Sequence, residues 1–521
     1  MCNQFTIAVF YVAEEGFFNP AESLMATRSL VMFLLLMAAN CADAMARDVW
    51  IQNVTIVSAE RAEPLAGANV KIHDGRVSEI SRSPLKGRRS DASIIDGKGL
   101  FLTPGLIDGH VHLGEIPGML PEQEKAHADI ARSAREQFPK SYLYFGFTTL
   151  VDLNSNPEDI ADWNSHPLHP DTFFCGAAMI MDGYPMSFVP KPIRYRLARY
   201  FLIEPGDESA LPQGIDPAEH TPAAVVARMK RDGAICVKTH YEHGFGAIRD
   251  LRVPKVETIQ ALVHEAHAAN LPVLLHANST DAQAFGIEAG VDVMAHGQWN
   301  WNTPNSVTEL TPEVTKVLQA VIDAKRGYQP TIQVLYGERD LFDDAFLSDP
   351  KLALAVPAGL IDWYRSPEGQ WYHDRLAKIA RITPGVKPDV DGKAIARVNH
   401  VVEFLAAHAV RLSFGSDTPS DETYANPPGL NGWLEMHKLV DSGVSPAQLF
   451  TAATLTNAQI FGLSGEIGTV EVGKRANLLL LSADPMLTLH AFDRIQKIIL
   501  HGNVIAPDAL AANRSNAPAH P

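Results

Sequence analysis

Two histidines stand two positions apart, His110 and His112, shortly after the apolar residues Leu106 and Ile107. On a β-strand, side chains two positions apart point to the same side, so both imidazoles would share one strand face. Two imidazoles on one face supply half of the four ligands of a typical protein zinc site. Alone, the pair is weak evidence for a metal, because most such pairs are incidental.

Polar side chains of metal-binding type also end four other apolar stretches. They are Lys238, His276, His296 and Asp417, which close the sequences CVK, VLLH, VMAH and FGSD. A lone buried lysine is costly to charge, and any one of these histidines taken alone is most simply a packed core residue. Six such residues at the same end of five strands indicate a common site, because in a barrel of parallel strands that end is the catalytic face.

The elements that would position these residues alternate along the middle of the chain, residues 103–467. Two helical patterns, 255–270 and 311–327, end near Asn or Gly, as helices commonly do. Alternating strands and helices predict a (β/α)8 TIM barrel. The eight candidate strands are 105–113, 148–154, 172–180, 234–240, 272–278, 292–297, 328–334 and 411–417.

Two connections in this barrel are long, residues 181–230 and 336–396. In a barrel, the loops that follow the strands form the rim of the active site, so both are candidate lids. A peripheral helical insertion is the alternative for the second connection. Its aromatic residues favour a bulky apolar group on a substrate; they are Tyr336, Trp363, Tyr364, Trp371 and Tyr372.

Short strand patterns occupy both ends of the chain. Residues 47–102 contain turn sequences such as His73-Asp74-Gly75, which fit hairpins, and residues 468–508 carry a similar pattern. We therefore expect a small composite β-sandwich domain built from both termini. Residues 509–521 are expected to be a disordered tail.

The N-terminal region, residues 1–46, is typical of an export signal. Residues 30–39 form an apolar run of about ten, too short for a bilayer span of about 20. Arg28 precedes this run, and Ala44-Met45-Ala46 follows it as a small-residue cleavage site. We expect cleavage after Ala46, translation from Met25, and a periplasmic or secreted protein. A buried N-terminal helix is the alternative.

Composition excludes several other classes of protein. Apolar residues make up 46% and charged residues 20% of 521, which is ordinary for a globular protein. The net charge is −16 and no basic patch stands out, which argues against nucleic acid as a partner. After cleavage only Cys175 and Cys236 would remain, and a reduced, buried state fits both. A homo-oligomer is compatible with the sequence.

As an ordered set, these motifs are identified as those of the amidohydrolase superfamily of metal-dependent hydrolases. The matching segments are TPGLIDGHVHL, VKTH, LLHAN, GVDVMAHG, GSDTP and the stretch from TAATLTNAQIFG to LLLLSADP. The chain most resembles the branch of imidazolonepropionase-like and Xaa-Pro dipeptidase-like members. The resemblance covers nearly all of residues 48–506, and it implies a barrel, a small composite β-sandwich and a metal-activated water.

The resemblance also implies a ligand set. His110, His112 and Asp417 match the ligands of a more buried ion, and Asp417 would accept the proton of the water. His276 and His296 match the ligands of a second ion. Lys238 matches a lysine that carbon dioxide carboxylates and that then bridges both ions. Such a set suits two divalent ions of the zinc type.

The residues that follow Lys238 and His296 each have two possible roles. His240 and Tyr241 follow Lys238 closely enough to polarise a substrate carbonyl, with ordinary loop packing as the alternative. Trp299 and Trp301 follow His296 and would form an apolar substrate wall or anchor a loop. The chain departs from many relatives at His276-Ala277-Asn278, where a further His or Ser is common.

The expected function is hydrolysis of an amide C–N bond in a dipeptide or an N-acyl amino acid with a bulky apolar group. Imidazolonepropionases are cytosolic, bind a single metal and lack the lysine, so an exported chain with Lys238 argues against that activity. A lactonase or esterase on the same binuclear site is the alternative within enzymes. A non-catalytic binding protein of this fold is the alternative outside them.

Overall fold

A computed structural model describes residues 48–87, 92–208, 211–245, 248–379, 388–420 and 422–513. These residues belong to one compact unit, Asp48–Pro521. The predicted export signal, residues 1–46, lies outside the described residues. Among the described residues, no helix is both long and apolar enough to span a bilayer.

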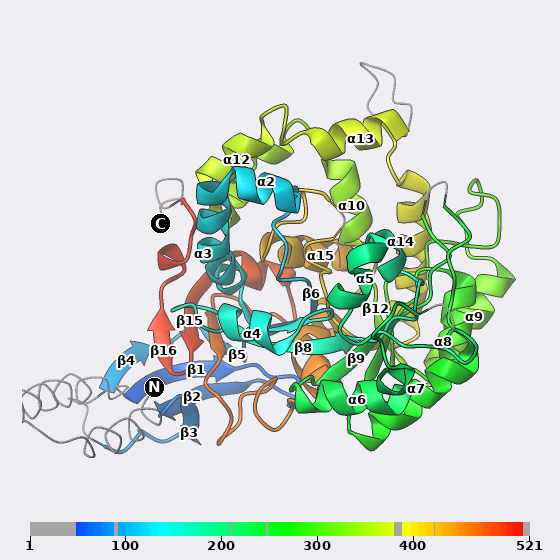
Figure 1. Cartoon of the computed structure of the whole chain (residues 1–521). Helices are drawn as coiled ribbons and strands as arrows, with labels where there is room; N and C mark the ends of the chain where they lie inside the picture. The colour runs from blue at the N-terminus through cyan, green and yellow to red at the C-terminus, as the bar shows by residue number, and fades with distance from the viewer. Residues whose placement is uncertain are drawn as a thin grey trace, which may run out of the picture. The chain divides into compact units, whose positions relative to one another are not determined.

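The described part of the chain contains a sheet of eight parallel strands, as the sequence predicts (Figure 1). All eight predicted strands are present. In spatial order they are β6 (Leu106–Val111), β7 (Phe147–Asp152), β8 (Asp171–Ala177), β9 (Cys236–His240), β10 (Val273–His276), β11 (Val293–Ala295), β12 (Gly327–Gln329) and β13 (Arg411–Leu412).

Backbone hydrogen bonds between β6 and the segment after β13 close this sheet into a barrel. Gly109 N donates to Phe414 O at 3.1 Å, and Asp417 N donates to His110 O at 2.7 Å. His112 N donates to Thr418 O at 2.6 Å. The closure therefore brings His110 and His112, at the end of β6, beside Asp417, which lies 305 residues further along the chain than His112.

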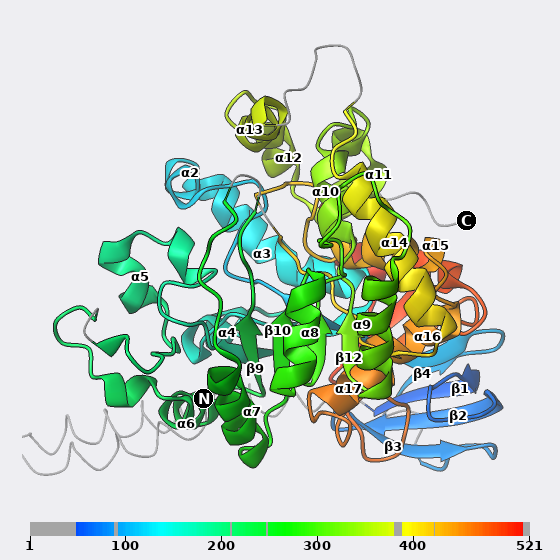
Figure 2. The ribbon, with the colours of Figure 1, turned by 90° about the vertical axis from the view of Figure 1, so that its right-hand side faces the viewer.

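Helices follow the strands and cover the outside of the barrel. Figure 2 shows α7, α8, α9 and α14 side by side. In α9, Thr311 caps the N-terminus, and Val314, Leu318 and Val321 form the buried stripe that packs on the strands. The barrel helices are α3 (Ala128–Tyr144), α4 (Pro157–Trp163), α6 (Pro222–Arg231), α7 (Val256–Ala268), α8 (Thr280–Ala289), α9 (Pro312–Asp323), α14 (Gly392–Ala407) and α15 (Leu430–Asp441). Shorter helices accompany them: α2 (Pro121–Ala126), α5 (Lys191–Leu197), α16 (Pro446–Thr451) and α17 (Asn457–Ile460).

Strands from both ends of the chain share one further sheet, which confirms the predicted composite β-domain. Strand β14 is fully buried and pairs with β5 from the N-terminal part on one side and with β15 on the other. The strands form one connected sheet. They are β1 (Asp48–Ile56), β2 (Leu65–His73), β3 (Arg76–Ser81), β4 (Ala92–Asp96), β5 (Phe101–Pro104), β14 (Leu478–Leu481), β15 (Ile495–Leu500) and β16 (Asn503–Ile505).

The connection after β12 is a helical insertion. It contains α10 (Gln333–Asp340), α11 (Pro350–Ala355), α12 (Ala358–Tyr364) and α13 (Trp371–Ile379), which lie on the side of the barrel away from β1–β3 in Figures 1 and 2. Tyr364 stacks on Tyr424 and donates to Pro117 O, and Trp371 Nε1 donates to Gly118 O. Most aromatic side chains of the insertion are buried, and Tyr364 and Trp371 hold it on the loop after β6. This burial does not support the interpretation that they face a substrate.

The tail differs from its prediction at residues 509–513. Leu510 is fully buried, and Gln137 of α3 donates to its carbonyl oxygen. Asn513 donates to the carbonyl oxygens of Ala353 and Val356 on the insertion. These contacts order a segment whose composition alone predicts disorder. Residues 514–521 lie outside the described residues.

The two cysteines of the barrel form a disulfide bond, which corrects the reduced state that fitted the sequence. Cys175 of β8 and Cys236 of β9 are register neighbours on adjacent parallel strands, with their Cα atoms 4.4 Å apart. Burial in a strand is equally compatible with free thiols. The pairing depends on the strand register, which the sequence does not provide.

Replacing both cysteines by alanine is expected to lower the free energy of unfolding by about 4 kcal/mol, because the bond closes a long loop in the unfolded chain. Urea unfolding under non-reducing conditions measures this difference. With a reductant present, wild type and variant should converge. Equal stability without a reductant would show that the bond contributes nothing to the fold.

Candidate metal centre

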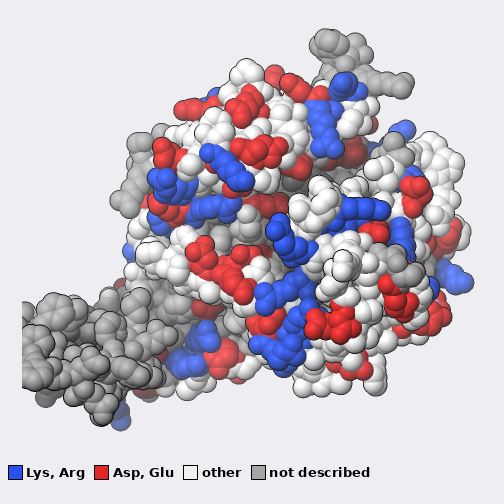
Figure 3. All heavy atoms as spheres, in the orientation of Figure 1, with Lys and Arg blue, Asp and Glu red and all other residues white. Residues whose placement is uncertain are grey.

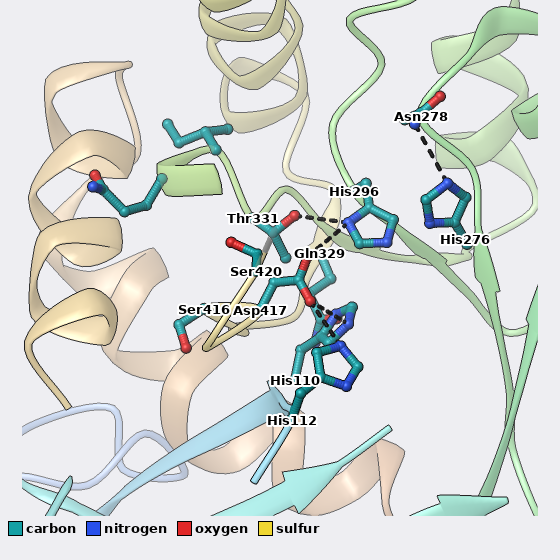
Figure 4. Close-up of polar contacts among 12 residues, drawn as sticks. His110, His112, His276, Asn278, His296, Gln329, Thr331, Ser416, Asp417 and Ser420 are labelled. Atoms are coloured by element: carbon teal, nitrogen blue, oxygen red, sulfur yellow. Dashed lines mark hydrogen bonds and ion pairs between the residues drawn. The ribbon is translucent and has the colours of Figure 1, made fainter. Parts of the chain in front are cut away.

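Three histidines surround Asp417 at the carboxyl ends of the barrel strands (Figure 4). The Nε2 atoms of His110 and His112 each lie 3.0 Å from Asp417 Oδ1. His296 Nδ1 lies 3.6 Å from Asp417 Oδ2. Ligand atoms of His110, His296 and Asp417 all fall within 4.8 Å of one another, a spacing that one metal ion can bridge.

Gln329 of β12 fixes the orientation of His110. The Gln329 amide nitrogen donates to the carbonyl oxygens of Gly109 and Phe414, both at 3.3 Å, so its oxygen must face the imidazole. His110 Nδ1 therefore donates to Gln329 Oε1 at 2.8 Å. This leaves the lone pair of His110 Nε2 turned toward Asp417, as in metal sites whose histidines are held by a partner behind them.

His296 and Asp417 both adopt positive backbone φ angles, 75° and 56°. Such angles are uncommon for residues other than glycine, and backbone hydrogen bonds hold them here. His296 N donates to Gln329 O at 2.8 Å, and Asp417 N donates to His110 O. Thr331 Oγ1 lies 3.0 Å from His296 Nδ1, which leaves His296 Nε2 for a ligand. The strand ends thus turn both side chains into one space.

Electrostatics suit this cluster to a cation. Burial lowers the pKa of His110 to about 4 and that of His296 well below its usual value, so both are neutral with free lone pairs at neutral pH. Burial opposes ionisation of Asp417, but its interactions with His110, His112 and His296 outweigh burial and hold its pKa well below normal. Neutral nitrogens around one carboxylate form a donor set for a divalent metal.

Lys238 of β9 is buried in the same region. Its side chain is 2% exposed, and Nζ has no hydrogen-bond partner among the described residues. Burial lowers the pKa of Lys238 to about 7. Burial is the main cause that lowers the pKa values of His110, His276 and His296, and a charge on Lys238 would lower them further. The amine therefore lies close to all three rings. A buried amine without a partner is unfavourable. Carboxylation of this amine would turn it into a carbamate whose oxygens can bind a metal.

His276 of β10 faces a carboxylate that the sequence did not single out. Its Nε2 donates to Glu242 Oε2 at 3.0 Å, and Asn278 Nδ2 donates to the same oxygen at 2.8 Å. Gly244 N donates to the other oxygen of Glu242 at 2.8 Å. The His276 ring lies 4.4 Å from that of His296, so its Nδ1 remains available on that side. Only the turn after β9 brings Glu242 here, and no sequence pattern signals that turn.

The two residues after Lys238 that were predicted to contact substrate have different positions. His240 lies on the same side of β9 as Lys238, with its ring 5.9 Å from His276, and its Nδ1 is buried without a hydrogen-bond partner in the described structure. Tyr241 follows on the opposite side, and its ring packs 4.6 Å from Phe285 of α8. The structure brings His240 to the cluster and does not bring Tyr241 there.

The two tryptophans after His296 also differ. Trp301 is buried, its indole donates to Gln298 O, and the Arg397 guanidinium lies 4.8 Å above its ring. These contacts match the loop-anchoring alternative. Trp299 is half-buried with its ring 6.2 Å from that of His296, so it borders the cluster.

Replacing Gln329 by leucine is expected to weaken metal binding by about 10- to 100-fold, because His110 loses the partner that orients it. Competition with a chelating dye measures the affinity. Gln319→Leu on α9 is a matched control, since the side chain of Gln319 donates to exposed Asp323 on its own helix and to no other described residue. Unchanged affinity in Gln329→Leu would exclude this role.

Comparisons with known proteins agree with this geometry. Residues 386–505 match the sequence model of the amidohydrolase family. An adenine deaminase of Ruegeria pomeroyi is 32% identical over 91 residues, or 18% of this chain and 15% of the relative. An enamidase of Eubacterium barkeri is 32% identical over 119 residues, 21% of this chain and 28% of the relative. The matched segments thus span less than a third of these curated relatives.

Solved structures match over a far larger share of the chain. A Xaa-Pro dipeptidase with bound methionine superposes with a TM-score of 0.58 at 19% identity and covers 88% of this chain and 100% of its own. Phenylurea hydrolase B superposes with a TM-score of 0.61 at 18% identity and covers 91% and 100%. At these identities the likeness establishes the shared fold.

Proposed function

The chain belongs to the amidohydrolase superfamily, and from this premise we propose that it is a metal-dependent hydrolase that cleaves a carbon–nitrogen bond in a small molecule. One observation carries the proposal. Asp417, held as an anion, faces three histidines at the carboxyl ends of the barrel strands, and the buried amine of Lys238 lies among the same rings. A purely structural core would not concentrate these groups at one strand end.

The proposed metal site holds two divalent ions, with zinc as the preferred metal. His110, His112 and Asp417 would hold the first ion, and His276 and His296 the second. Lys238, carboxylated on Nζ, would bridge them. Its depressed pKa supports this, because a neutral amine is the form that takes up carbon dioxide. When bound, such ions polarise a carbonyl and lower the pKa of water toward about 7.

The residues of the chain itself then divide the remaining work. Asp417 accepts the proton of the attacking water and passes it to the leaving nitrogen. Its low pKa keeps the carboxylate deprotonated, which is the form that can accept this proton. His240, whose Nδ1 is buried without a hydrogen-bond partner among the described residues, would contact the substrate carbonyl oxygen. Tyr241 has no part in this proposal, because its ring packs on α8.

The proposed substrate is a dipeptide or an N-acyl amino acid with a bulky apolar group. A library of such compounds, incubated with zinc-reconstituted protein, tests this by the release of free amine. Lactones in the same assay separate an amidase from an esterase. A protein that binds no metal and releases no product from any compound would instead be a non-catalytic binding protein.

We further propose that the chain is exported and that its signal is cleaved after Ala46. The disulfide between Cys175 and Cys236 supports export, because such bonds persist mainly in oxidising compartments. N-terminal sequencing of protein from the periplasm or medium should begin at Arg47. A mature cytosolic protein that retains residues 25–46 would contradict this.

A further inference from the structure

Three aromatic side chains stand beside the predicted metal ligands, here called the metal cluster, and are not themselves ligands. They are Tyr184, Phe188 and Phe245, here called the aromatic wall. Tyr184 lies at their centre, with ring centroids 5.7 Å from Phe188 and 5.3 Å from Phe245. The wall touches the cluster directly, because the Tyr184 ring lies 4.9 Å from His276 and 5.7 Å from His240.

The wall comes from the connections that follow β8 and β9. Tyr184 and Phe188 lie in the first, and Phe245 lies in the second. A backbone bridge between Gly183 and Arg252 joins the two connections. Both strands end on the catalytic face, so the wall borders the space in which a substrate would meet His240 and His276.

The wall is unusually open for such large apolar groups. Phe188 is 50% exposed and Phe245 is 40% exposed. By contrast, most aromatic rings of the insertion 333–379 are buried, as Tyr364 and Trp363 illustrate. Solvent contact with an aromatic ring is unfavourable, so an exposed aromatic group beside a reactive site indicates a surface that a ligand covers.

Hydrogen bonds hold the described backbone next to these rings. The buried guanidinium of Arg194 donates to Val189 O at 2.9 Å, to Ser187 O at 3.0 Å and to Asp182. These bonds brace the turn that carries Tyr184 and Phe188. In the second connection, Gly244 N is bound by Glu242, and Arg249 donates to Gly244 O at 3.1 Å, next to Phe245. The wall is therefore held in place before any ligand arrives, which lowers the entropic cost of binding.

We propose that the aromatic wall is a specificity subsite that binds an aromatic ring of the substrate, with the scissile bond then lying over the metal cluster. Rings pack best edge-to-face or offset against other rings, and the rings of Phe188 and Phe245 lie 6.5 Å apart with an interplanar angle of 30°. This inference rests on the proposed function, since it names the substrate class of the same site. The sequence predicted that Trp301 and the rings of the insertion would contact the apolar group of the substrate. The proposal assigns this contact to the aromatic wall instead.

The test compares selectivity, not activity alone. Two substrate pairs place the ring on either side of the amide: N-acetyl-phenylalanine against N-acetyl-alanine, and N-benzoyl-alanine against N-acetyl-alanine. Wild type should favour the aromatic member of at least one pair in kcat/KM by about tenfold or more. In the double variant Phe188→Ala/Phe245→Ala this ratio should fall toward one, while metal content and turnover of N-acetyl-alanine stay unchanged.

Two further variants make the test specific. Leu197→Ala removes an exposed apolar side chain from the same connection, 61% exposed, and should leave the ratio unchanged. Phe245→Leu keeps an apolar surface but removes the ring, and its ratio should fall between those of wild type and the double variant. A wild-type ratio in Phe245→Leu would overturn the aromatic preference, and a wild-type ratio in the double variant would overturn the subsite itself.

Failure of the proposed function is distinguishable from failure of the subsite. If wild type cleaves no amide, the proposed function fails, and calorimetric binding of N-acetyl-phenylalanine and N-acetyl-alanine then tests the wall alone. Tighter binding of the aromatic compound that is lost in the double variant supports the subsite. Equal binding of the two compounds by wild type overturns it.

Discussion

Asp417→Asn is expected to lower kcat by about three orders of magnitude, within the range for losing a general base. The amide is nearly the same size as the carboxylate but cannot accept the proton of the attacking water. It also removes the negative charge that faces His110 and His112 at 3.0 Å, so the variant should bind less metal than wild type. Kinetics and metal content measured on one preparation give both effects.

Asp129→Asn is the matched control, since this carboxylate is 93% exposed and, among the described residues, pairs only with Arg132 on its own helix. It should retain full activity. Thermal unfolding of Asp417→Asn shows whether the fold survives, as it should, because the backbone bonds from Asp417 N and His112 N remain. Near-normal turnover with full metal in a folded variant would exclude Asp417 as the proton acceptor.

Lys238→Ala is expected to bind less than one equivalent of the second metal and to lose activity by orders of magnitude. The amine is buried without a hydrogen-bond partner in the described structure, and a carbamate on it would supply an oxygen to each ion. Acetate or propionate added to the variant should occupy the vacated space and restore part of the rate. Lys238→Glu should restore less than wild-type activity, because its carboxylate sits on a shorter arm.

Metal content by mass spectrometry, measured beside the rate, separates this from a one-metal site. A site built on His110, His112 and Asp417 alone would leave Lys238→Ala with near-normal turnover at one metal per chain. Lys230→Ala on the outer helix α6 provides the control, since Lys230 is exposed and its loss should change neither quantity.

The barrel and the cluster around Asp417 were predictable because they follow from strand periodicity. Apolar runs such as 272–278 end in a polar residue, and parallel strands bring such ends together whatever the loops do. Because His240 and Tyr241 are consecutive, the strand period places their side chains on opposite sides of β9. To tell which of the two faces the cluster, one must know which side of β9 points inward. The structure supplies that choice.

The remaining features of the site depend on loop paths that no periodic pattern encodes. Glu242 reaches His276 only because the chain turns at Gly244, and Phe245 joins Tyr184 only because two connections meet at Gly183 and Arg252. Aromatic content misled for the same reason. The insertion after β12 is rich in rings because they join it to the core of the barrel, whereas only a few rings stand beside the predicted metal ligands.

The position of β14 between β5 and β15 also affects the order in which this sheet can form during synthesis. A ribosome makes β5 more than 370 residues before β14, so during most of synthesis the edge of β5 that pairs with β14 has no partner strand. An open edge of this kind recruits other chains, and contacts so distant in sequence form slowly. We therefore expect the N-terminal strands to be open to mispairing along that edge until translation is almost complete.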